Sequence, residues 1–208
     1  MFTHIRAASL TLQSVLQRRF RADPGLAQMF DPMMGGTAII SLATPDGMET
    51  AGDTGLSMWL YRLIRDEQLL NEPPRRIPTN LVRRQPLPVR AHYLMTPIIT
   101  GNAKMPAPEA EQLIIGSVLQ TFHDEPLISG SDLAGSYEGT AIELAVRLET
   151  LGLDETSRIW EGLERSYQLS ISYEVAVVVI GSALHPISAP TVKVVMPQVA
   201  IGAPGAQP

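Results

Sequence analysis

Four histidines and a set of acidic side chains could support acid–base chemistry in this chain, and one histidine has an acidic neighbour. In His123-Asp124, the aspartate could orient the imidazole as a general base. The pair falls where a helix is predicted to end. At that position a histidine interacts favourably with the helix dipole and an aspartate favours the following turn. We therefore interpret the pair as structural.

The spacing of the other candidates gives little support to metal or carboxylate chemistry. The histidines are widely separated and lack the short two-ligand spacing of a structural metal site: His4, His92, His123 and His185. Glu143 and Glu149 share the polar face of one predicted strand, which we interpret as a solvated face and not as a glycosidase pair. A phosphate-binding glycine loop, a nucleophile elbow, a zincin helix and an EF-hand loop are all absent from the sequence. We predict no catalytic residue, no metal and no cofactor.

Composition is typical of one compact domain. The chain has 208 residues, of which 45% are hydrophobic and 18% charged, enough to bury a single core. Cysteine is absent, which excludes disulfides and thiolate metal sites and fits a reducing cytosol. No signal-peptide pattern and no apolar run of about 20 residues is found, so we expect a cytoplasmic chain.

Charge is unevenly distributed along the chain. The formal net charge of -5 argues against nucleic acid as the main partner, because phosphate binding needs a concentrated positive face. Seven of the sixteen basic residues nevertheless lie between positions 62 and 90, whereas residues 107–164 carry twelve acidic residues and two arginines. The two regions are either separate solvated surfaces or a basic and an acidic patch that meet between subunits of a ring.

The stretch 167–181 is the strongest strand signal and is predicted to organise the fold. Apolar residues alternate on one side from Leu169 to Val179. The other side begins with Ser170, Ser172 and Glu174 and then becomes apolar. The pattern predicts an exposed face in the first half and cover on both faces in the second half.

The remaining elements are placed by periodicity and by helix start and stop signals. Helices are predicted at 3–20, from 108 to a stop at Pro126, and at 154–163 with Asp154 as the cap and Trp160 as a packing anchor. Strands are predicted at 37–44, 54–64, 89–96, 127–129 and 142–148. Loops are predicted at 22–36, at the turn 45–47 and at the proline-rich stretch 65–88.

These elements predict a mixed α/β (α+β) fold. We expect a single domain at 1–182, with a mixed, largely antiparallel sheet flanked by about three helices. Residues 183–208, rich in proline and alanine, are expected to form an extended C-terminal arm.

Several blocks, taken in order, resemble the tail-terminator or cap proteins of contractile injection systems of the antifeeding-prophage and virulence-cassette type. The resemblance covers most of the chain. Each block is short, but their order and spacing make the match specific. The blocks are Leu60-Tyr61-Arg62, Asn71-Glu72-Pro73-Pro74-Arg75-Arg76, Leu87 with Ala91-His92-Tyr93-Leu94-Met95-Thr96, the stretches 116–129, 142–148 and 154–160, and Tyr167-Gln168-Leu169-Ser170 with the strand that follows.

The resemblance implies a structural role without catalysis. Such proteins form a homohexameric ring on the end of tube and sheath distal to the baseplate, where the ring stops polymerisation. The implied partners are the inner tube protein and the sheath protein within a phage tail-like particle. Whether that particle is released, stays in the cytosol or attaches to a membrane is left open, as are the contacts of residues 22–36 and 197–208.

Two sets of residues are expected to make contacts between subunits or with the tube. The first is a basic set around the proline-rich stretch, which arginine–carboxylate pairing would join to an acidic surface: Arg62, Asn71, Arg75, Arg76, Arg83 and Arg84. The second is the alternating segment of the arm that could add as a strand to a neighbour: Val192, Val194 and Met196.

Two alternatives stay open at this stage. A tube-end completion protein of a phage tail would share the structural class. A small soluble enzyme or effector would instead bring His92, His123 and Asp132 together by folding. Such a protein would be a monomer with a deep polar pocket, whereas a cap would assemble into a ring.

Overall fold

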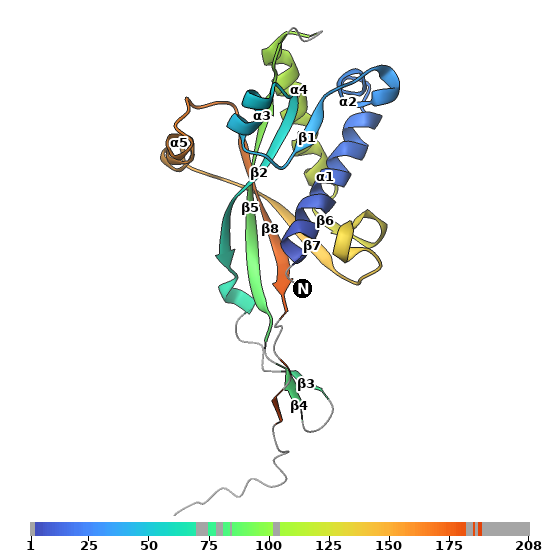
Figure 1. Cartoon of the computed structure of the whole chain (residues 1–208), viewed down its shortest axis with the longest axis vertical. Helices are drawn as coiled ribbons and strands as arrows, with labels where there is room; N and C mark the ends of the chain where they lie inside the picture. Colours follow the sequence, from blue (N-terminus) through green and yellow to red (C-terminus); the bar gives the residue numbers. More distant parts are fainter. Residues whose placement is uncertain are drawn as a thin grey trace, which may run out of the picture.

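The computed structural model describes residues 3–69, 75–77, 81–83, 85–101, 105–181, 185 and 187–188. In these ranges a six-stranded sheet carries helices on its faces, and a small three-stranded sheet lies beyond the ends of its longest strands (Figure 1). The mixed α/β class is therefore confirmed. No helix in these ranges combines the length and the apolar character that a bilayer span requires.

The described residues contain five α-helices, two more than the sequence predicts. The helices are α1 (His4–Ala22), α2 (Ala27–Phe30), α3 (Pro45–Ala51), α4 (Ala107–Asp124) and α5 (Leu153–Gly162). Four short 3₁₀ turns accompany them: η1 (Pro32–Met34), η2 (Glu67–Leu69), η3 (Gly130–Asp132) and η4 (Gly135–Tyr137).

The large sheet is mixed and largely antiparallel, as predicted. Its strands are β1 (Ile39–Ser41), β2 (Gly55–Arg65), β5 (Leu87–Ile98), β8 (Ile171–Ile180), β7 (Glu143–Glu149) and β6 (Leu127–Ser129), in that spatial order. Only the β1–β2 pair is parallel. The predicted organising strand is β8, which lies inside the sheet between β5 and β7.

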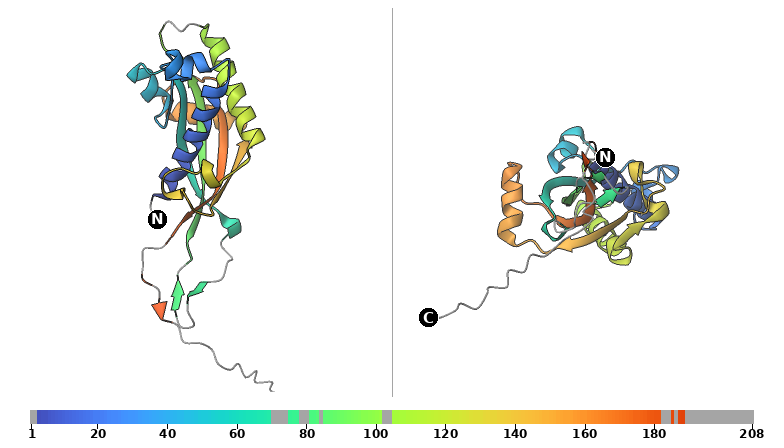
Figure 2. Two further views of the ribbon diagram at one scale, coloured as in Figure 1. Left: turned by 90° about the vertical axis from the view of Figure 1, so that its right-hand side faces the viewer. Right: turned by 90° about the horizontal axis from the view of Figure 1, so that it is seen from below.

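One face of this sheet forms the main core with α1 and α4. Along β5, Ala91, Tyr93 and Met95 belong to this core. Every third or fourth residue of α1, from Ala8 through Leu12 to Phe20, packs against them. Figure 2 shows α1 and α4 on this side of the strands, while α5 lies on the other side.

Two short helices replace predicted loop or turn. At 45–47, Thr44 accepts a hydrogen bond from the Gly47 amide at 3.1 Å and Pro45 occupies the first turn, so the chain enters α3 instead of turning back. In the predicted loop 22–36, α2 and η1 form, and the Asp31 carboxylate accepts a hydrogen bond from the Met33 amide at 2.9 Å. Both helices, of four and seven residues, are too short for hydrophobic periodicity to predict them.

Proline does not end β5 where the sequence predicts it should. Pro97 pairs with Leu56 of β2, beyond the last β5–β8 pair at Met95. Pro88 pairs with Val179 of β8, beyond the last β2–β5 pair at Val89. At each proline β5 pairs with only one strand, although the Pro88 carbonyl also accepts a hydrogen bond from the Asp66 amide at 3.0 Å. A proline is tolerated there because no strand pairing needs its missing amide hydrogen.

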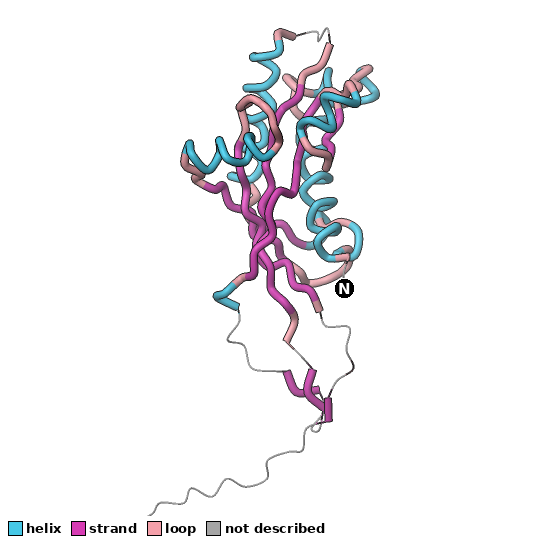
Figure 3. The backbone as a smooth tube through the Cα atoms, turned by 60° about the vertical axis from the view of Figure 1, so that its left-hand side comes forward, coloured by secondary structure: helices cyan, strands magenta, loops and turns pink. Residues whose placement is uncertain are grey.

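The proline-rich stretch 65–88 contains two strands where the sequence predicts only loop. β3 (Arg75–Ile77) pairs with β4 (Leu81–Arg83), and β4 pairs with β9 (Ile187–Ser188) from the predicted arm. Figure 3 shows these three strands set apart from the large sheet and beyond the ends of β5 and β8. The segment therefore carries backbone structure that projects from the main domain.

Helix α5 is anchored by Trp160, as predicted. Its indole is 2% exposed and donates a hydrogen bond to the Ser170 hydroxyl at 3.3 Å. The predicted cap Asp154 is wrong, because the helix starts one residue earlier and Gly152 stands at the cap position. The Glu155 carboxylate accepts a hydrogen bond from the Gly152 amide at 3.0 Å and so performs the capping.

Candidate functional site

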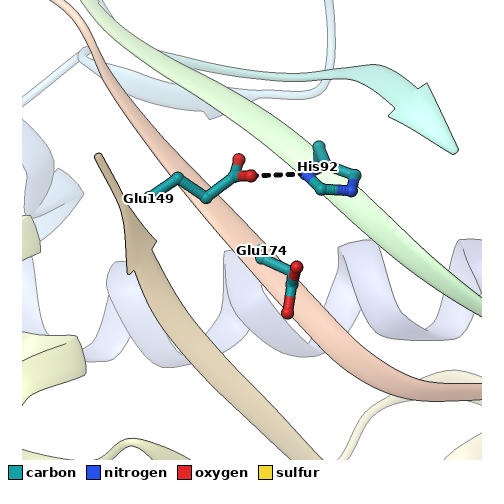
Figure 4. A group of neighbouring side chains, drawn as sticks. All are labelled: His92, Glu149 and Glu174. Carbon is teal, nitrogen blue, oxygen red and sulfur yellow. Dashed lines mark hydrogen bonds and ion pairs between the residues drawn. The ribbon is translucent and has the colours of Figure 1, made fainter. Parts of the chain in front are cut away.

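The sheet face opposite the main core carries a buried cluster of polar side chains. On β5 and β8 the residues that alternate with the core positions are His92 and Glu174, and the two stand directly opposite each other in the register. Glu149 comes from the end of β7, paired with Ser172 of β8. Three neighbouring strands thus deliver these groups to one place, as Figure 4 shows for His92, Glu149 and Glu174.

Glu149 is the centre of the hydrogen bonds in this cluster. Its Oε1 lies 2.8 Å from Nδ1 of His92, and its Oε2 accepts a hydrogen bond from the Ser172 hydroxyl at 2.6 Å. The Tyr61 hydroxyl lies 3.1 Å from that of Ser172 and 3.4 Å from Oε2. Burial raises the pKa of Tyr61, so this phenol stays protonated at neutral pH.

Arg90 joins two further carboxylates to the cluster. Its Nη2 donates to Oδ1 of Asp66 at 3.1 Å, and its Nη1 lies 3.3 Å from Oε2 of Glu174. The hydrogen bond from Arg90 lowers the pKa of Asp66, and the same bond raises the pKa of Arg90. The Nε of Arg90 is 3.1 Å from Oδ2 of Asp66 but is not aligned for a hydrogen bond, so its contact is ionic.

The cluster corrects the expectation for the first half of the organising strand. Ser172 is 3% exposed, and only 14% of the Glu174 side chain is exposed, although the alternation predicts a solvated face there. The prediction that Glu149 belongs to a solvated face is also wrong, because its carboxylate is bonded within the cluster. Polar residues in the middle of a strong strand pattern, at Ser172 and Glu174, were the available signal for this site.

The three side chains have some features of a cation site, but their ligand atoms already interact with other side chains of this protein. One ligand atom from each of His92, Glu149 and Glu174 lies within 4.8 Å of the others. Glu174 is already paired with Arg90, and Nδ1 of His92 is already bonded to Glu149. The Nε2 of His92 is buried without a hydrogen-bond partner among the described residues. We interpret the cluster as an ion-pair network that fixes four strands relative to one another.

The fold does not bring His92, His123 and Asp132, the candidate catalytic residues, together. His92 is buried on β5 and bonded to Glu149, whereas His123 is exposed in the last turn of α4. Asp132 pairs with Arg18 of α1 at 2.5 Å. Each of these three side chains thus has a separate environment, and the structure gives no support to an enzyme built from them.

Only part of the predicted interface lies in the described ranges. Arg62 is exposed on β2, in register with His92. Arg75, Arg76 and Arg83 lie in β3 and β4, at the projecting small sheet. The other predicted contact residues lie outside the described residues: Asn71, Arg84, Val192, Val194 and Met196.

Comparison with protein families identifies the chain. The family profile of the Pvc16 N-terminal domain matches residues 7–193, from within α1 to beyond β9. The chain belongs to this family. A comparison with curated proteins finds no match.

Comparison with solved structures finds two terminator proteins among its matches. One is the sheath/tube terminator of an extracellular contractile injection system, PVC, in its extended state, with a TM-score of 0.52 and 19% identity over 87% of this chain. The chain spans 64% of the length of that terminator. The other is the anti-feeding prophage cap, with a TM-score of 0.49 and 18% identity over 73% of this chain and 51% of that one.

Large apolar side chains are exposed at several places on this Pvc16 N-terminal domain. They include Met33, Met34, Ile39 and Leu42 in one stretch of the sequence, and Leu153, Tyr167 and Leu169 in another. The described residues thus hold a buried ion-pair network on one sheet face and exposed apolar side chains elsewhere.

Proposed function

We propose that this chain is a structural subunit of a contractile injection system that caps the end of tube and sheath distal to the baseplate and so terminates polymerisation. The observation that carries the proposal is the family match over residues 7–193. The fold that the chain shares with a sheath/tube terminator supports the same role. A fold alone permits many functions, so the proposal rests on the family first.

The proposed working form is a homohexameric ring that contacts the inner tube protein and the sheath protein and has no catalytic activity. The uneven charge along the chain supports complementary surfaces, basic at 62–90 and acidic at 107–164, although Arg90, Asp132 and Glu149 pair within the subunit. Each subunit would present both surfaces, as a head-to-tail ring requires. The ring would form in the cytoplasm as part of a phage tail-like particle.

Particle length is the direct test of this role. The tube and sheath genes are expressed with and without this chain, and particle lengths are measured by negative-stain electron microscopy. We expect a narrow length distribution with the chain present and longer, heterogeneous tubes without it. Equal distributions, with the purified chain bound to neither tube nor sheath, would overturn the proposal.

We propose that the basic cluster around the small sheet binds acidic surface on an adjoining subunit or on the terminal tube ring. The four arginines are Arg75, Arg76, Arg83 and Arg84. Replacing all four by glutamate should abolish ring formation or capping while the circular dichroism of the monomer stays unchanged. The matched control reverses four exposed arginines elsewhere, and it should assemble normally: Arg6, Arg21, Arg147 and Arg158.

We propose that the C-terminal segment makes contacts outside its own subunit, by strand addition of residues 191–196 to a neighbour or to the sheath. A chain that ends at Ser182 tests this. The shortened chain should fold, because the large sheet is complete at Ile180, but it should cap fewer tubes. Normal capping by the shortened chain would show that the segment is dispensable.

A further inference from the structure

The outer edge of β2 is open along most of its length. Figure 1 shows β2 at the margin of the large sheet, next to β5. β2 pairs with β1 only at 55–57, whereas its pairing with β5 continues from Gly55 to Arg65. Among the residues that the structure describes, positions 59–65 therefore have a strand on one side only. Such an edge presents backbone amide and carbonyl groups that can pair with a further strand.

The side chains of this edge oppose pairing with an identical edge. Arg62 and Arg65 are both exposed, so two β2 edges side by side would place arginines of both copies close together. A register shift between Leu60 and Arg62 also bends the strand locally. Leu63, in contrast, is 45% exposed and offers an apolar contact. The edge therefore favours a strand of different sequence that can cover Leu63.

The chain carries a segment of this kind shortly after β9. Val192, Val194 and Met196 alternate with a lysine and a valine, which is the period-two pattern of a strand with one apolar side. This arm segment (residues 191–196) lies outside the described residues. If extended, it would span about 20 Å, which is comparable with the length of the open β2 edge.

The direction of β9 takes the chain away from its own large sheet. β4 leads into β5 and points toward the large sheet, as the left view of Figure 2 shows. β9 is antiparallel to β4, so the chain leaves β9 in the opposite direction. Only Ala189 and Pro190 follow before the arm segment, and they reach about 7 Å at most. Even if the chain turned back there, the arm segment would start at the small sheet, beyond the ends of the large sheet (Figure 3), and not beside its own residues 59–65.

We propose that the arm segment of one copy adds as a strand to the open β2 edge, residues 59–65, of a second copy of this chain. Its backbone would pair with the free edge, and its apolar side would cover Leu63. The donor and acceptor surfaces differ, so the contact repeats head to tail and closes into a ring when the rotation permits. The inference rests on the proposed cap function and deepens it, because it names the acceptor of the C-terminal segment.

Cysteine cross-linking tests this contact in the full chain, which has no cysteine of its own. Leu63→Cys is one variant, and single cysteines at each position from 191 to 196 are the others. Each arm variant is mixed with Leu63→Cys and mildly oxidised, so that a link between the two joins two copies. We expect covalent dimers whose yield alternates along the segment and is highest at Val192, Val194 and Met196, because successive side chains of a strand point to opposite faces. The Leu63→Cys/Val194→Cys double variant should give a ladder of oligomers.

Two control positions have exposed leucines elsewhere. Leu113→Cys, on α4, is 43% exposed, which matches Leu63, and it should not link to the arm segment. Leu127→Cys lies on β6 at the opposite margin of the sheet and should not link either. Yields without alternation, or equally high with either control, would overturn the proposal.

The remaining outcomes separate this interface from the cap function. A double variant that links only within one copy would overturn the proposal, as would an arm that links to tube or sheath protein and not to Leu63→Cys. Ring formation and capping without the link to position 63 would reject this interface but leave the cap function standing. The link in a chain that does not cap tubes would do the reverse.

A proline in the arm segment gives a second measurement. Val194→Pro removes an amide hydrogen and interrupts strand pairing, so self-association measured by analytical ultracentrifugation should weaken by at least about tenfold. Ala203→Pro, beyond the segment and beside Pro204, is the control and should leave association within about twofold of wild type. Unchanged association of Val194→Pro would overturn the proposal.

Discussion

The two faces of the large sheet are both buried but by different means. The face toward α1 and α4 is closed by apolar side chains such as Leu56, Tyr93 and Val175. The opposite face holds His92 and the carboxylates of Glu149 and Glu174. These polar groups are paired with one another and with Arg90 by hydrogen bonds and ion pairs. The comparison shows that buried charge in a strand does not by itself indicate catalysis. In this sheet it can set the register of neighbouring strands, a role that apolar contacts perform less selectively.

The largest loss is expected on the apolar face. Phe20 is fully buried and packs edge to face against Phe30 at 4.8 Å between ring centroids. Phe20→Ala should lower the free energy of unfolding by about 3–5 kcal/mol, because it removes apolar contacts and leaves a cavity. Urea unfolding measures this. Leu113→Ala, exposed on α4, is the control and should change stability by less than about 0.5 kcal/mol. Equal effects of the two would contradict the assignment of this face as the core.

A smaller loss is expected when the polar face loses its central cation. Arg90→Met leaves Asp66 and Glu174 without their charged partner, and it should cost about 2–4 kcal/mol in unfolding free energy. Arg147→Met is the matched control, since Arg147 is exposed and stands opposite Glu174 on β7, and it should cost below about 1 kcal/mol. If both changes cost the same, the polar face does not depend on the buried ion pairs.

The sequence predicted the apolar face much better than the polar one. Period-two and helical patterns located α1, α4, β2, β7 and β8 because their core residues are regular in the local sequence. Nothing local showed that Glu149 would meet His92, since that contact depends on strand order and sheet curvature. The helices α2 and α3 were missed because four and seven residues are too few to show helical periodicity; Thr44 caps α3, whereas α2 has no side-chain cap. The prolines of β5 were misread because edge position is a tertiary property.

The pair His92 and Glu149 should contribute less than Arg90. Glu149→Gln keeps the shape of the side chain but removes the negative charge of the carboxylate that contacts His92 and Ser172. We expect the free energy of unfolding to fall by about 1–2 kcal/mol. Glu143→Gln, on the same strand but exposed, should cost less than about 0.5 kcal/mol. A double-mutant cycle with His92→Gln separates direct from indirect effects. A coupling energy near zero would show that the two side chains act independently.

The smallest effect is expected in the contribution of Asp66 to the pH dependence of the unfolding free energy. Arg90 lowers the pKa of Asp66 in the folded state below its ordinary value of 3.8. The stabilisation is therefore fully present well above pH 3.8, and it is lost as the pH falls from there through the lowered folded pKa. The difference in unfolding free energy between wild type and Asp66→Asn should be constant near neutral pH and shrink below about pH 4. A difference in unfolding free energy that grows as the pH falls would contradict this prediction.

The pairing of β5 with β8 also determines when the sheet can form. Arg90 and Glu174 are in contact across this pair although 84 positions separate them in the chain. Closing such a loop costs chain entropy, so helices α1 and α4 can form early while the centre of the sheet forms late and slowly. During synthesis, β5 and β7 expose unpaired edges until residues 171–180 have left the ribosome. Until then the nascent chain is at its most prone to aggregate, and a chain that stops short of β8 stays in that state.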